Sequence, residues 1–320
     1  MGVRRFDVSM IDARWARGYF AVQALAGALW WIAVFTVPPV RAATLGDLDA
    51  GLIALADIPL FVGGSLLAVC GPRWSAWIIT PWTLLVTAGM ALYATLTTQA
   101  GWGALLMVAA SAGSVAAGVV LLLNRVPAEW IFQGPFRIRP ARGTGARHHL
   151  LNTAAQIVVF WAVLLWLVPI AIRFIEERWR LDLPVPGWVR IAGVVLFAAA
   201  APVGLWSAAV MASLGEGTPL PAAAARDLVV VGPYRVVRNP MAVAGIGQGV
   251  ASGLILGSWL VVLYALAGAL IWNWLVRPGE EADLEARFGE PFRRYRDSVN
   301  CWFPRLRRSA VRTGSSAPRG

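Results

Sequence analysis

The sequence predicts an all-α, polytopic integral membrane protein: a bundle of about eight transmembrane helices that ends in a helical hairpin and a cytoplasmic tail. Hydrophobic residues make up 58% of the 320-residue chain and charged residues only 14%, with a mean hydropathy of +0.64. A water-soluble domain carries about 25% charged residues to cover its wet surface. The composition therefore excludes a soluble globule.

The basic residues follow membrane topology. All 28 are arginines, against 17 acidic residues, which gives a net charge of +11 and a pI near 11.1. In a soluble protein this balance would point to nucleic acid. Here the arginines lie between apolar runs, as the positive-inside rule requires, so we expect a membrane partner and no nucleic acid.

Eight apolar segments approach the roughly 20 residues that cross a hydrocarbon core of about 30 Å. They are Tyr19–Val37, Leu52–Val69, Trp77–Thr97, Gly101–Leu123, Ala154–Ile172, Trp188–Met211, Met241–Leu256 and Trp259–Val276. The seventh segment is short, and only Gly257-Ser258 separates it from the eighth. This pair predicts a tight helical hairpin.

The longest arginine-rich loop sets the expected orientation. Between the fourth and fifth segments lie Arg125, Arg137, Arg139, Arg142 and Arg147, so this loop is predicted to be cytoplasmic. Eight crossings then place both termini in the cytoplasm, and we expect the plasma (inner) membrane. The chain divides into a four-span region of unknown role (1–125), a basic cytoplasmic loop (126–150), a working membrane region (151–308) and a disordered tail (309–320).

Several single residues need interpretation. Cys70 and Cys301 lie far apart and the only histidines are His148 and His149, so we expect no disulfide framework and no metal site. Asp57 is an acid well inside a span, which marks a functional site by default. Alternatively, Pro59 breaks the helix and Asp57 binds the freed backbone N–H groups. Aromatic residues near span ends are expected in interfacial belts: Trp30, Trp31, Trp74, Trp188 and Trp259.

Polar residues gather directly before the seventh segment, over residues 226–240. Gly232-Pro233 predicts a turn. Pro240 suits the first turn of the next helix, where its missing N–H costs nothing, with Asn239 as the N-cap. This pattern fits a ligand-binding loop, but also a structural loop that precedes a capped helix.

A second polar cluster, residues 277–284, follows the eighth segment. The hairpin returns it to the same membrane face, so Arg238, Asn239, Arg277 and Glu280 are expected to meet. The alternative is an amphipathic surface helix with i,i+4 pairs such as Asp283–Arg287.

Glycines recur every four residues along the seventh segment, at Gly245, Gly249, Gly253 and Gly257. Such a ridge lets another helix backbone approach closely. Contact with a flat ligand is the alternative interpretation. A dinucleotide fingerprint is rejected, because the run lies in a membrane span with no preceding strand.

Taken in order, these motifs resemble those of the isoprenylcysteine carboxyl methyltransferase family and its phospholipid methyltransferase relatives. The matching residues are Gly232-Pro233-Tyr234, Arg238-Asn239-Pro240, Glu280-Glu281 with Leu284, Phe288-Gly289 with Phe292 and Tyr295, and Pro304. They span about 80 residues, with the hairpin between their halves. The first four spans fall outside the resemblance.

The resemblance implies methyl transfer from S-adenosyl-L-methionine to a lipophilic acceptor within a membrane cavity. Carried over by position, cofactor contacts fall on Arg226, Asp227, Leu228, Val229, Tyr234, Asn239, Pro240, Met241, Ala242 and Glu280, and a substrate contact on Arg277. A carboxylate such as Glu280 and an aromatic face such as Tyr234 favour a cationic sulfonium cofactor. Carboxyl O-methylation is the first expected chemistry and N-methylation of a lipid amine the second.

The sequence departs from the family at two positions. The family histidine is Asn239 here, and the tyrosine that follows is Ala242. Asparagine forms hydrogen bonds but does not titrate, and alanine removes a hydroxyl and a ring. Two alternatives therefore stay open: a non-catalytic membrane scaffold or lipid-binding protein, and an NADPH-dependent membrane reductase.

Overall fold

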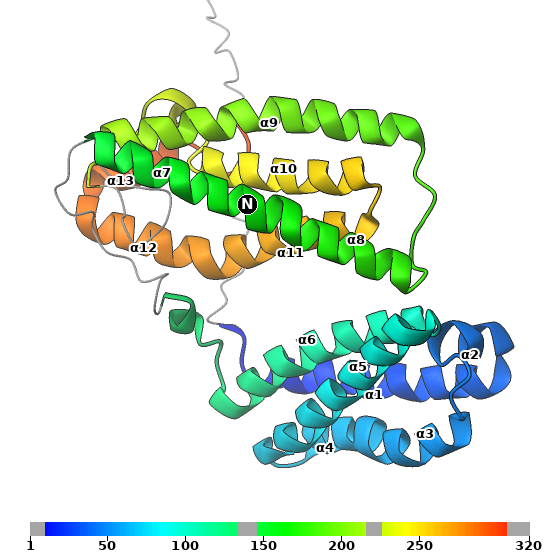
Figure 1. The fold of residues 1–320 in the computed structure, drawn as a ribbon. Coiled ribbons are helices and arrows are strands. Elements are labelled where there is room, and N and C mark those ends of the chain that lie inside the picture. Colours follow the sequence, from blue (N-terminus) through cyan, green and yellow to red (C-terminus); the bar gives the residue numbers. More distant parts are fainter. Residues whose placement is uncertain (1–9, 133–145, 216–225, 306–320) are drawn as a thin grey trace, which may run out of the picture.

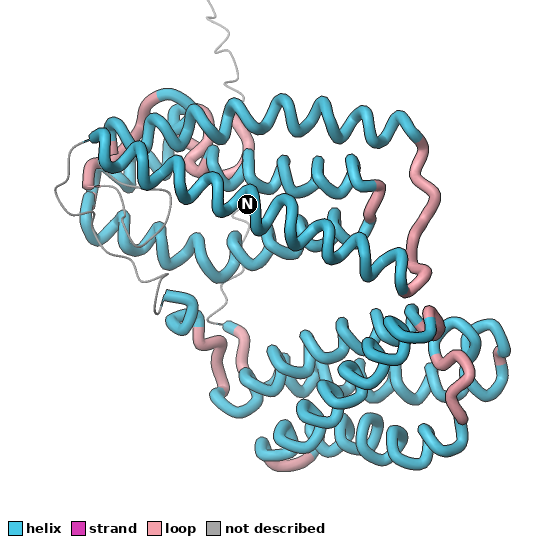
Figure 2. Tube along the Cα trace, in the orientation of Figure 1, coloured by secondary structure: helices cyan, strands magenta, loops and turns pink. Residues whose placement is uncertain are grey.

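The computed structural model describes residues 10–132, 146–215 and 226–305. All regular structure in these ranges is helical (Figure 2). Seven of the described helices are long and apolar enough to cross a membrane, and the apolar helix Pro240–Leu256 is shorter. The predicted all-α polytopic bundle is confirmed.

The N-terminal unit contains four crossings (Figure 1). Helix α1 (Ala13–Thr36) leads through the short α2 (Pro38–Thr44) to a second crossing, made of α3 (Ala50–Asp57), a π-helical segment (Ile58–Gly63) and α4 (Gly64–Cys70). Helices α5 (Ala76–Thr97) and α6 (Gly101–Leu123) complete the unit. Phe20, Ile79 and Leu121 are fully buried in its core.

The C-terminal unit contains three of the long apolar helices and the shorter apolar helix Pro240–Leu256, shown from green to orange in Figure 1. The first joins α7 (Ala146–Phe160), a π-helical segment (Trp161–Leu167) and α8 (Val168–Arg178), and the second is α9 (Gly187–Leu214). The hairpin α10 (Pro240–Leu256) and α11 (Trp259–Ile271) follows, with α12 (Arg277–Phe288) and α13 (Glu290–Ser298) at its end. Helix α10 packs along α9 and against α11.

The predicted hairpin is confirmed, and its turn is tied to α8. Gly257 has φ +65°, a left-handed conformation that favours glycine, and the Ser258 side chain caps α11. The Ser258 hydroxyl donates to the buried Glu176 carboxylate, and Arg173 donates to the Gly257 carbonyl over 3.3 Å. The charged residues at this end therefore hold the hairpin turn in place.

The helix continues beyond the predicted eighth segment. The eighth segment was expected to end at Val276, but the helix runs on from Trp259 to Phe288 through a π-helical segment, Trp272–Val276. Pro278 lies in the first turn after that segment, where its missing N–H interrupts no regular α-helical ladder. The second polar cluster is thus rigidly joined to the membrane helix.

The glycines of α10 have two different surroundings. A Cβ atom on Gly253 would lie 2.7 Å from Val262 Cγ2, and one on Gly249 would lie 3.0 Å from Ala265 Cβ. These two glycines allow close packing with α11. Gly245 instead faces Phe160, 3.5 Å from an added Cβ, and borders a cavity.

The alternative interpretation of Asp57 as a backbone ligand is wrong. Its carboxylate accepts hydrogen bonds from two indole N–H groups, those of Trp31 at 2.9 Å and Trp82 at 3.0 Å. Trp31 is 3% exposed, so it belongs to the core and not to an interfacial belt. Trp74 and Trp188 are exposed, as a belt requires.

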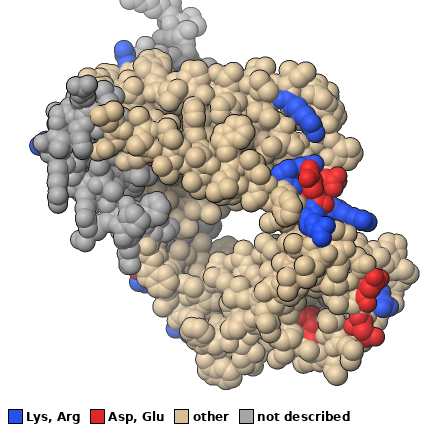
Figure 3. Space-filling view, in the orientation of Figure 1, with Lys and Arg blue, Asp and Glu red and all other residues tan. Residues whose placement is uncertain are grey.

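Charged side chains lie mainly at the helix ends on the face shown in Figure 3, and the surface between them is almost uncharged. The start of α1 lies beside the end of α6, because the Asn124 side chain accepts from the Ala13 N–H over 3.2 Å. The 3₁₀ turn after α6 (Ala128–Phe132) contacts the segment before α12. Most of the predicted basic loop and the whole predicted tail lie outside the described residues.

Candidate active site

The loop before α10 forms the predicted turn. Gly232 has φ +57°, and Gly232–Arg235 makes a single 3₁₀ turn that buries the Tyr234 ring. The Tyr234 hydroxyl donates to the Ser207 carbonyl of α9 over 3.3 Å, and the Tyr234 carbonyl accepts from the Tyr295 hydroxyl over 2.6 Å. The turn is therefore held between α9 and α13.

Both tyrosines stay neutral at physiological pH. Burial raises the pKa of Tyr234 above its ordinary value of 10.0, and the nearby Tyr295 adds to the effect. Burial also raises the pKa of Tyr295, although the Arg238 charge opposes the shift. Each hydroxyl therefore acts as a hydrogen-bond donor, and the Tyr234 ring is buried.

Asn239 is the predicted N-cap of α10. Its side-chain oxygen accepts from the Ala242 N–H over 3.0 Å, and Pro240 occupies the first turn and is buried. A cap of this kind satisfies one of the free N–H groups at the helix start. The amide hydrogens of Asn239 are not used by the cap and remain donors for another acceptor.

Arg238 joins the two polar clusters. Its guanidinium donates to the carbonyls of Arg296 at 2.9 Å and Val299 at 2.7 Å, and forms an ion pair with Glu281 at 2.8 Å. The side chain is 8% exposed. Of the four residues that were expected to meet, Arg238 and Arg277 line one pocket, but the acid that pairs with Arg238 is Glu281 and not Glu280.

The acids of α12 differ in their partners. Glu281 pairs with Arg238, Asp283 pairs with Arg287 at 2.6 Å as predicted, and Glu285 pairs with Arg296. Glu280 is half-buried and is the acid of this helix without an arginine partner in the described part of the chain. A half-buried carboxylate in this state is well suited to a cationic ligand.

Arg277 lies in a large polar pocket of about 630 Å³. Arg238, Arg296 and Arg305 line the same pocket, together with the aromatic side chains of Trp274, Trp302 and Phe303. The Nε atom of Arg277 is buried and has no hydrogen-bond partner. Arg238 and Arg296 are paired with acids of α12 and Asp297 also lines the pocket. Arg277 and Arg305 therefore supply its excess positive charge, which favours an anionic group.

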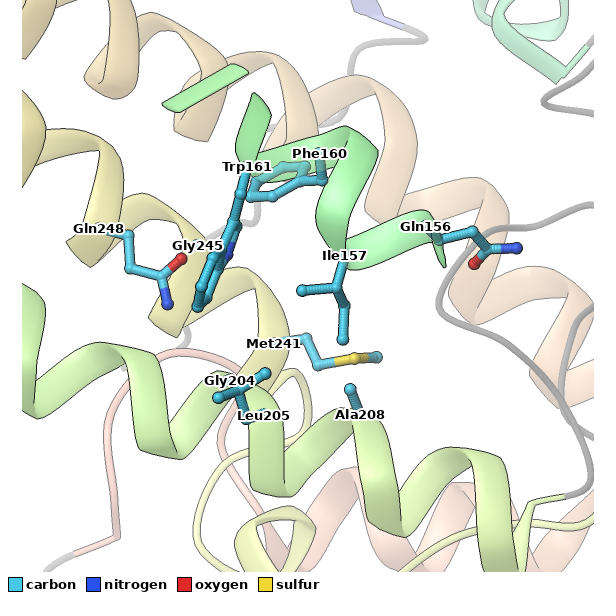
Figure 4. Close-up of a pocket in the computed structure, with 10 residues that line it drawn as sticks. All are labelled: Gln156, Ile157, Phe160, Trp161, Gly204, Leu205, Ala208, Met241, Gly245 and Gln248. Atoms are coloured by element: carbon cyan, nitrogen blue, oxygen red, sulfur yellow. The ribbon is translucent and has the colours of Figure 1, made fainter. Parts of the chain in front are cut away.

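An apolar cavity of about 150 Å³ lies between α7, α9 and α10 (Figure 4). Phe160 and Trp161 come from the first crossing of the unit, Gly204 and Ala208 from α9, and Met241 from the first turn of α10. The absence of a side chain at Gly245 leaves room beside Phe160. The cavity begins within one turn of the Asn239 cap.

The predicted cofactor residues occupy different environments. Arg226 and Asp227 are exposed, Leu228 and Ala242 are half-buried, and Val229 is buried. Of the predicted residues, Met241 lines the apolar cavity and Arg277 lines the arginine pocket. Sequence reasoning missed Phe160, Trp161 and Gln248 as cavity residues. Gln248 is a buried amide within an apolar helix, and that polar residue in a span was the available signal.

Comparison with known families identifies this region. Residues 188–291 match the family model described as phospholipid methyltransferase. The region is a phospholipid methyltransferase domain. It belongs to the isoprenylcysteine carboxyl methyltransferase-like family, which confirms the resemblance seen in the sequence. No curated protein and no solved structure matches the chain.

The phospholipid methyltransferase domain extends from α9 into the start of α13. It therefore contains the turn, the capped start of α10, the hairpin and α12. Helices α1–α6 and the first crossing of the C-terminal unit lie outside the match. The chain is thus a multi-pass membrane protein with a methyltransferase-family domain in its second half.

Proposed function

We propose that the domain transfers a methyl group from S-adenosyl-L-methionine to a lipophilic acceptor, and that the acceptor group is a carboxylate. The observation that carries the proposal is the state of Glu280. This half-buried acid has no arginine partner in the described structure, while its neighbours on α12 are paired. Glu280 is also the acid at which the sequence resemblance implies a cofactor contact.

The residues present suit this cofactor. Glu280 would hold the ammonium group of the amino-acid tail by a charge-assisted hydrogen bond. The amide hydrogens of Asn239 would hold a carboxylate or a ribose oxygen, and the buried Tyr234 would hold the turn in place through its bonds to Ser207 and Tyr295. When bound, the cofactor would supply an electrophilic methyl group on sulfonium sulfur. Arg226, Asp227, Leu228 and Val229 would complete the contacts before the turn, and Pro240, Met241 and Ala242 those after it.

The arginine pocket supports a carboxylate acceptor. The unpaired Nε of Arg277 and the surrounding guanidinium groups would bind and orient a carboxylate, since arginine matches carboxylate geometry. A carboxylate is already a nucleophile at pH 7, so it needs no general base. Asn239 occupies the family histidine position and does not titrate, which suits such an acceptor.

The apolar cavity supports the lipophilic character of the substrate. Its walls of aromatic and aliphatic side chains begin beside the first turn of α10. The domain exerts its effect by alignment, because holding the nucleophile and the methyl donor together removes much of the entropic barrier. N-methylation of a lipid amine is the second candidate, supported by the similarity to phospholipid methyltransferases. We further propose that the site faces the cytoplasm, at the inner membrane, with both termini on that side.

Equilibrium binding of S-adenosyl-L-methionine to the detergent-purified full chain tests the site. We expect micromolar affinity for the wild type, a loss of about tenfold or more for Glu280→Gln, and wild-type affinity for Asp283→Asn. Asp283 is the matched control, because it lies on the same helix but is paired with Arg287.

The outcomes separate the alternatives. Equal affinity of Glu280→Gln and wild type would refute the role of Glu280. No binding to the wild type up to millimolar concentration would refute the cofactor and favour a scaffold, whereas saturable binding of NADPH in its place would favour a reductase. If the cofactor binds, radiolabelled methyl transfer to a lipid extract, followed by mild base, identifies a base-labile methyl ester; a base-stable product would indicate the amine.

A further inference from the structure

A second cavity lies inside the N-terminal unit, outside the methyltransferase domain. It encloses about 370 Å³ and is bounded by residues of α1, α3, α5 and α6, the blue and cyan helices of Figure 1. Cavities that bind small organic molecules begin at about 300 Å³. The cavity is therefore large enough for a ligand of its own.

The wall of this cavity carries the Asp57 carboxylate. Asp57 is 6% exposed, and each of its oxygens accepts one indole N–H, from Trp31 and from Trp82. A carboxylate has about four acceptor positions, so two indoles leave acceptor capacity unused. Among the described residues that line the cavity none is basic. Asp57 thus lacks a countercharge where an isolated charge is costly.

The other polar side chains around the cavity already have partners. The Trp30 indole donates to Thr44 over 3.0 Å, and the Tyr19 hydroxyl donates to the Ala110 carbonyl over 3.0 Å. The Gln23 amide donates to Ser65 and accepts from Ser114. The carboxylate of Asp57 is consequently the group in this wall that would gain most from a ligand.

The cavity opens toward the lipid-facing side of the bundle. Val22 and Ala26 of α1 line it and are exposed, as are Leu106 and Ala109 of α6. These residues lie on adjacent turns of two helices that pack together. A ligand that partitions into the bilayer can therefore reach Asp57 without crossing the polar ends of the helices.

The walls select the kind of cation. Tyr19, Trp30 and Phe61 place aromatic rings around the cavity, and aromatic faces attract alkylated ammonium groups. A metal ion such as Ca²⁺ or Mg²⁺ needs about six oxygen ligands, which this mostly apolar wall does not offer. We propose that the N-terminal unit binds a lipophilic ammonium ion, a protonated amine with an apolar chain, whose N–H group donates to Asp57.

Binding of N,N-dimethyloctylamine to the full chain in phosphatidylcholine nanodiscs tests this proposal. Equilibrium dialysis of the radiolabelled amine at pH 7, with empty nanodiscs subtracted, gives the saturable part. We expect binding near one amine per chain, and an affinity about tenfold or more above that of the neutral analogue N,N-dimethyloctanamide. Asp57→Asn is expected to abolish this preference.

Two further variants keep the test decisive. Ser111→Ala removes a buried hydroxyl that bonds to Thr87 in the same unit but does not line the cavity, and it should bind as the wild type does. Ala26→Phe blocks the rim without touching the Asp57 hydrogen bonds, and it should weaken binding even if Asp57→Asn fails to fold. No saturable binding to the wild type, equal binding of amine and amide, or unchanged binding in folded Asp57→Asn or in Ala26→Phe would overturn the proposal. The proposal is independent of the methyltransferase activity.

Discussion

The two halves of the chain place their polar groups differently, although both are bundles of apolar helices. In the N-terminal unit, polar side chains form hydrogen bonds between neighbouring helices in the interior of the bundle. Examples are the Thr87–Ser111 contact of 2.6 Å and the bonds of Asp57 to two indole groups. In the C-terminal unit the hydrogen-bonded arginines and acids gather at the helix ends, around Arg238 and α12. The buried pairs join neighbouring helices of the N-terminal unit, whereas the groups at the helix ends hold the loop and terminal segments of the C-terminal unit together. The same bilayer constraint therefore yields a cavity that opens to the lipid-facing side in the N-terminal unit, and a polar mouth around Arg238 and Arg277 in the C-terminal unit.

The largest effect should come from breaking the polar mouth. Arg238→Ala removes two hydrogen bonds to the C-terminal segment and leaves the Glu281 carboxylate without its partner. Removing one member of a buried ion pair destabilises by about 3 kcal/mol or more. We expect a lower midpoint of thermal unfolding in detergent and a loss of cofactor binding, with amine binding by the N-terminal unit unchanged.

Arg293→Ala is the control for this change. Arg293 pairs with Glu290 at the surface of α13 and is about half exposed, so its removal should leave the unfolding midpoint unchanged. If Arg238→Ala and Arg293→Ala have the same unfolding midpoint, Arg238 does not hold the polar mouth together. The proposed difference between the two halves would then be wrong for the C-terminal unit.

An intermediate effect is expected from glycines that differ in their surroundings. A Cβ atom on Gly103 of the N-terminal unit would lie 1.9 Å from the Thr44 carbonyl oxygen, whereas one on Gly245 of the C-terminal unit meets only Phe160, at 3.5 Å. Overpacking against backbone costs about 1–3 kcal/mol. Gly103→Ala should therefore lower the unfolding midpoint clearly, and Gly245→Ala should fold normally.

The same pair of variants distinguishes packing from ligand space. Gly245→Ala places a methyl group at the edge of the apolar cavity, so it should weaken binding or turnover of a lipophilic acceptor while cofactor affinity stays as in the wild type. Equal unfolding midpoints for the two alanine variants would show that the helices of the N-terminal unit are no more tightly packed at Gly103 than α10 is at Gly245.

The smallest effect should come from Tyr295→Phe. The change removes the hydrogen bond to the Tyr234 carbonyl, which contributes about 1 kcal/mol. Because burial raises the pKa of Tyr295 in the folded state, its contribution is complete below pH 10 and is lost as the pH rises further. Unfolding free energy measured against pH should fall less steeply above pH 10 in the variant. A curve identical to that of the wild type would contradict the role of this hydroxyl.

Several features could be predicted from the sequence because they depend on local pattern. Runs of apolar residues require helices in a bilayer, since backbone groups have no water to bond. Gly257-Ser258 determines the hairpin through a left-handed glycine and a serine cap, and Asn239-Pro240 determines the start of α10. The family motifs follow the same order along the chain, which is why the methyltransferase domain was recognisable before any contact was known.

Contacts between distant segments were decided only by the tertiary structure. The choice of Glu281 over Glu280 as the partner of Arg238 depends on the rotation of α12, which adjacent sequence positions do not reveal. Trp31 looked like an interfacial residue, and only the packing of α1 against α3 and the π-helical segment Ile58–Gly63 turns it toward Asp57. The two cavities likewise arise where small residues of different helices face each other. Local patterns set the helices and their caps, but the relative rotation of packed helices determines which polar groups meet and which remain for a ligand.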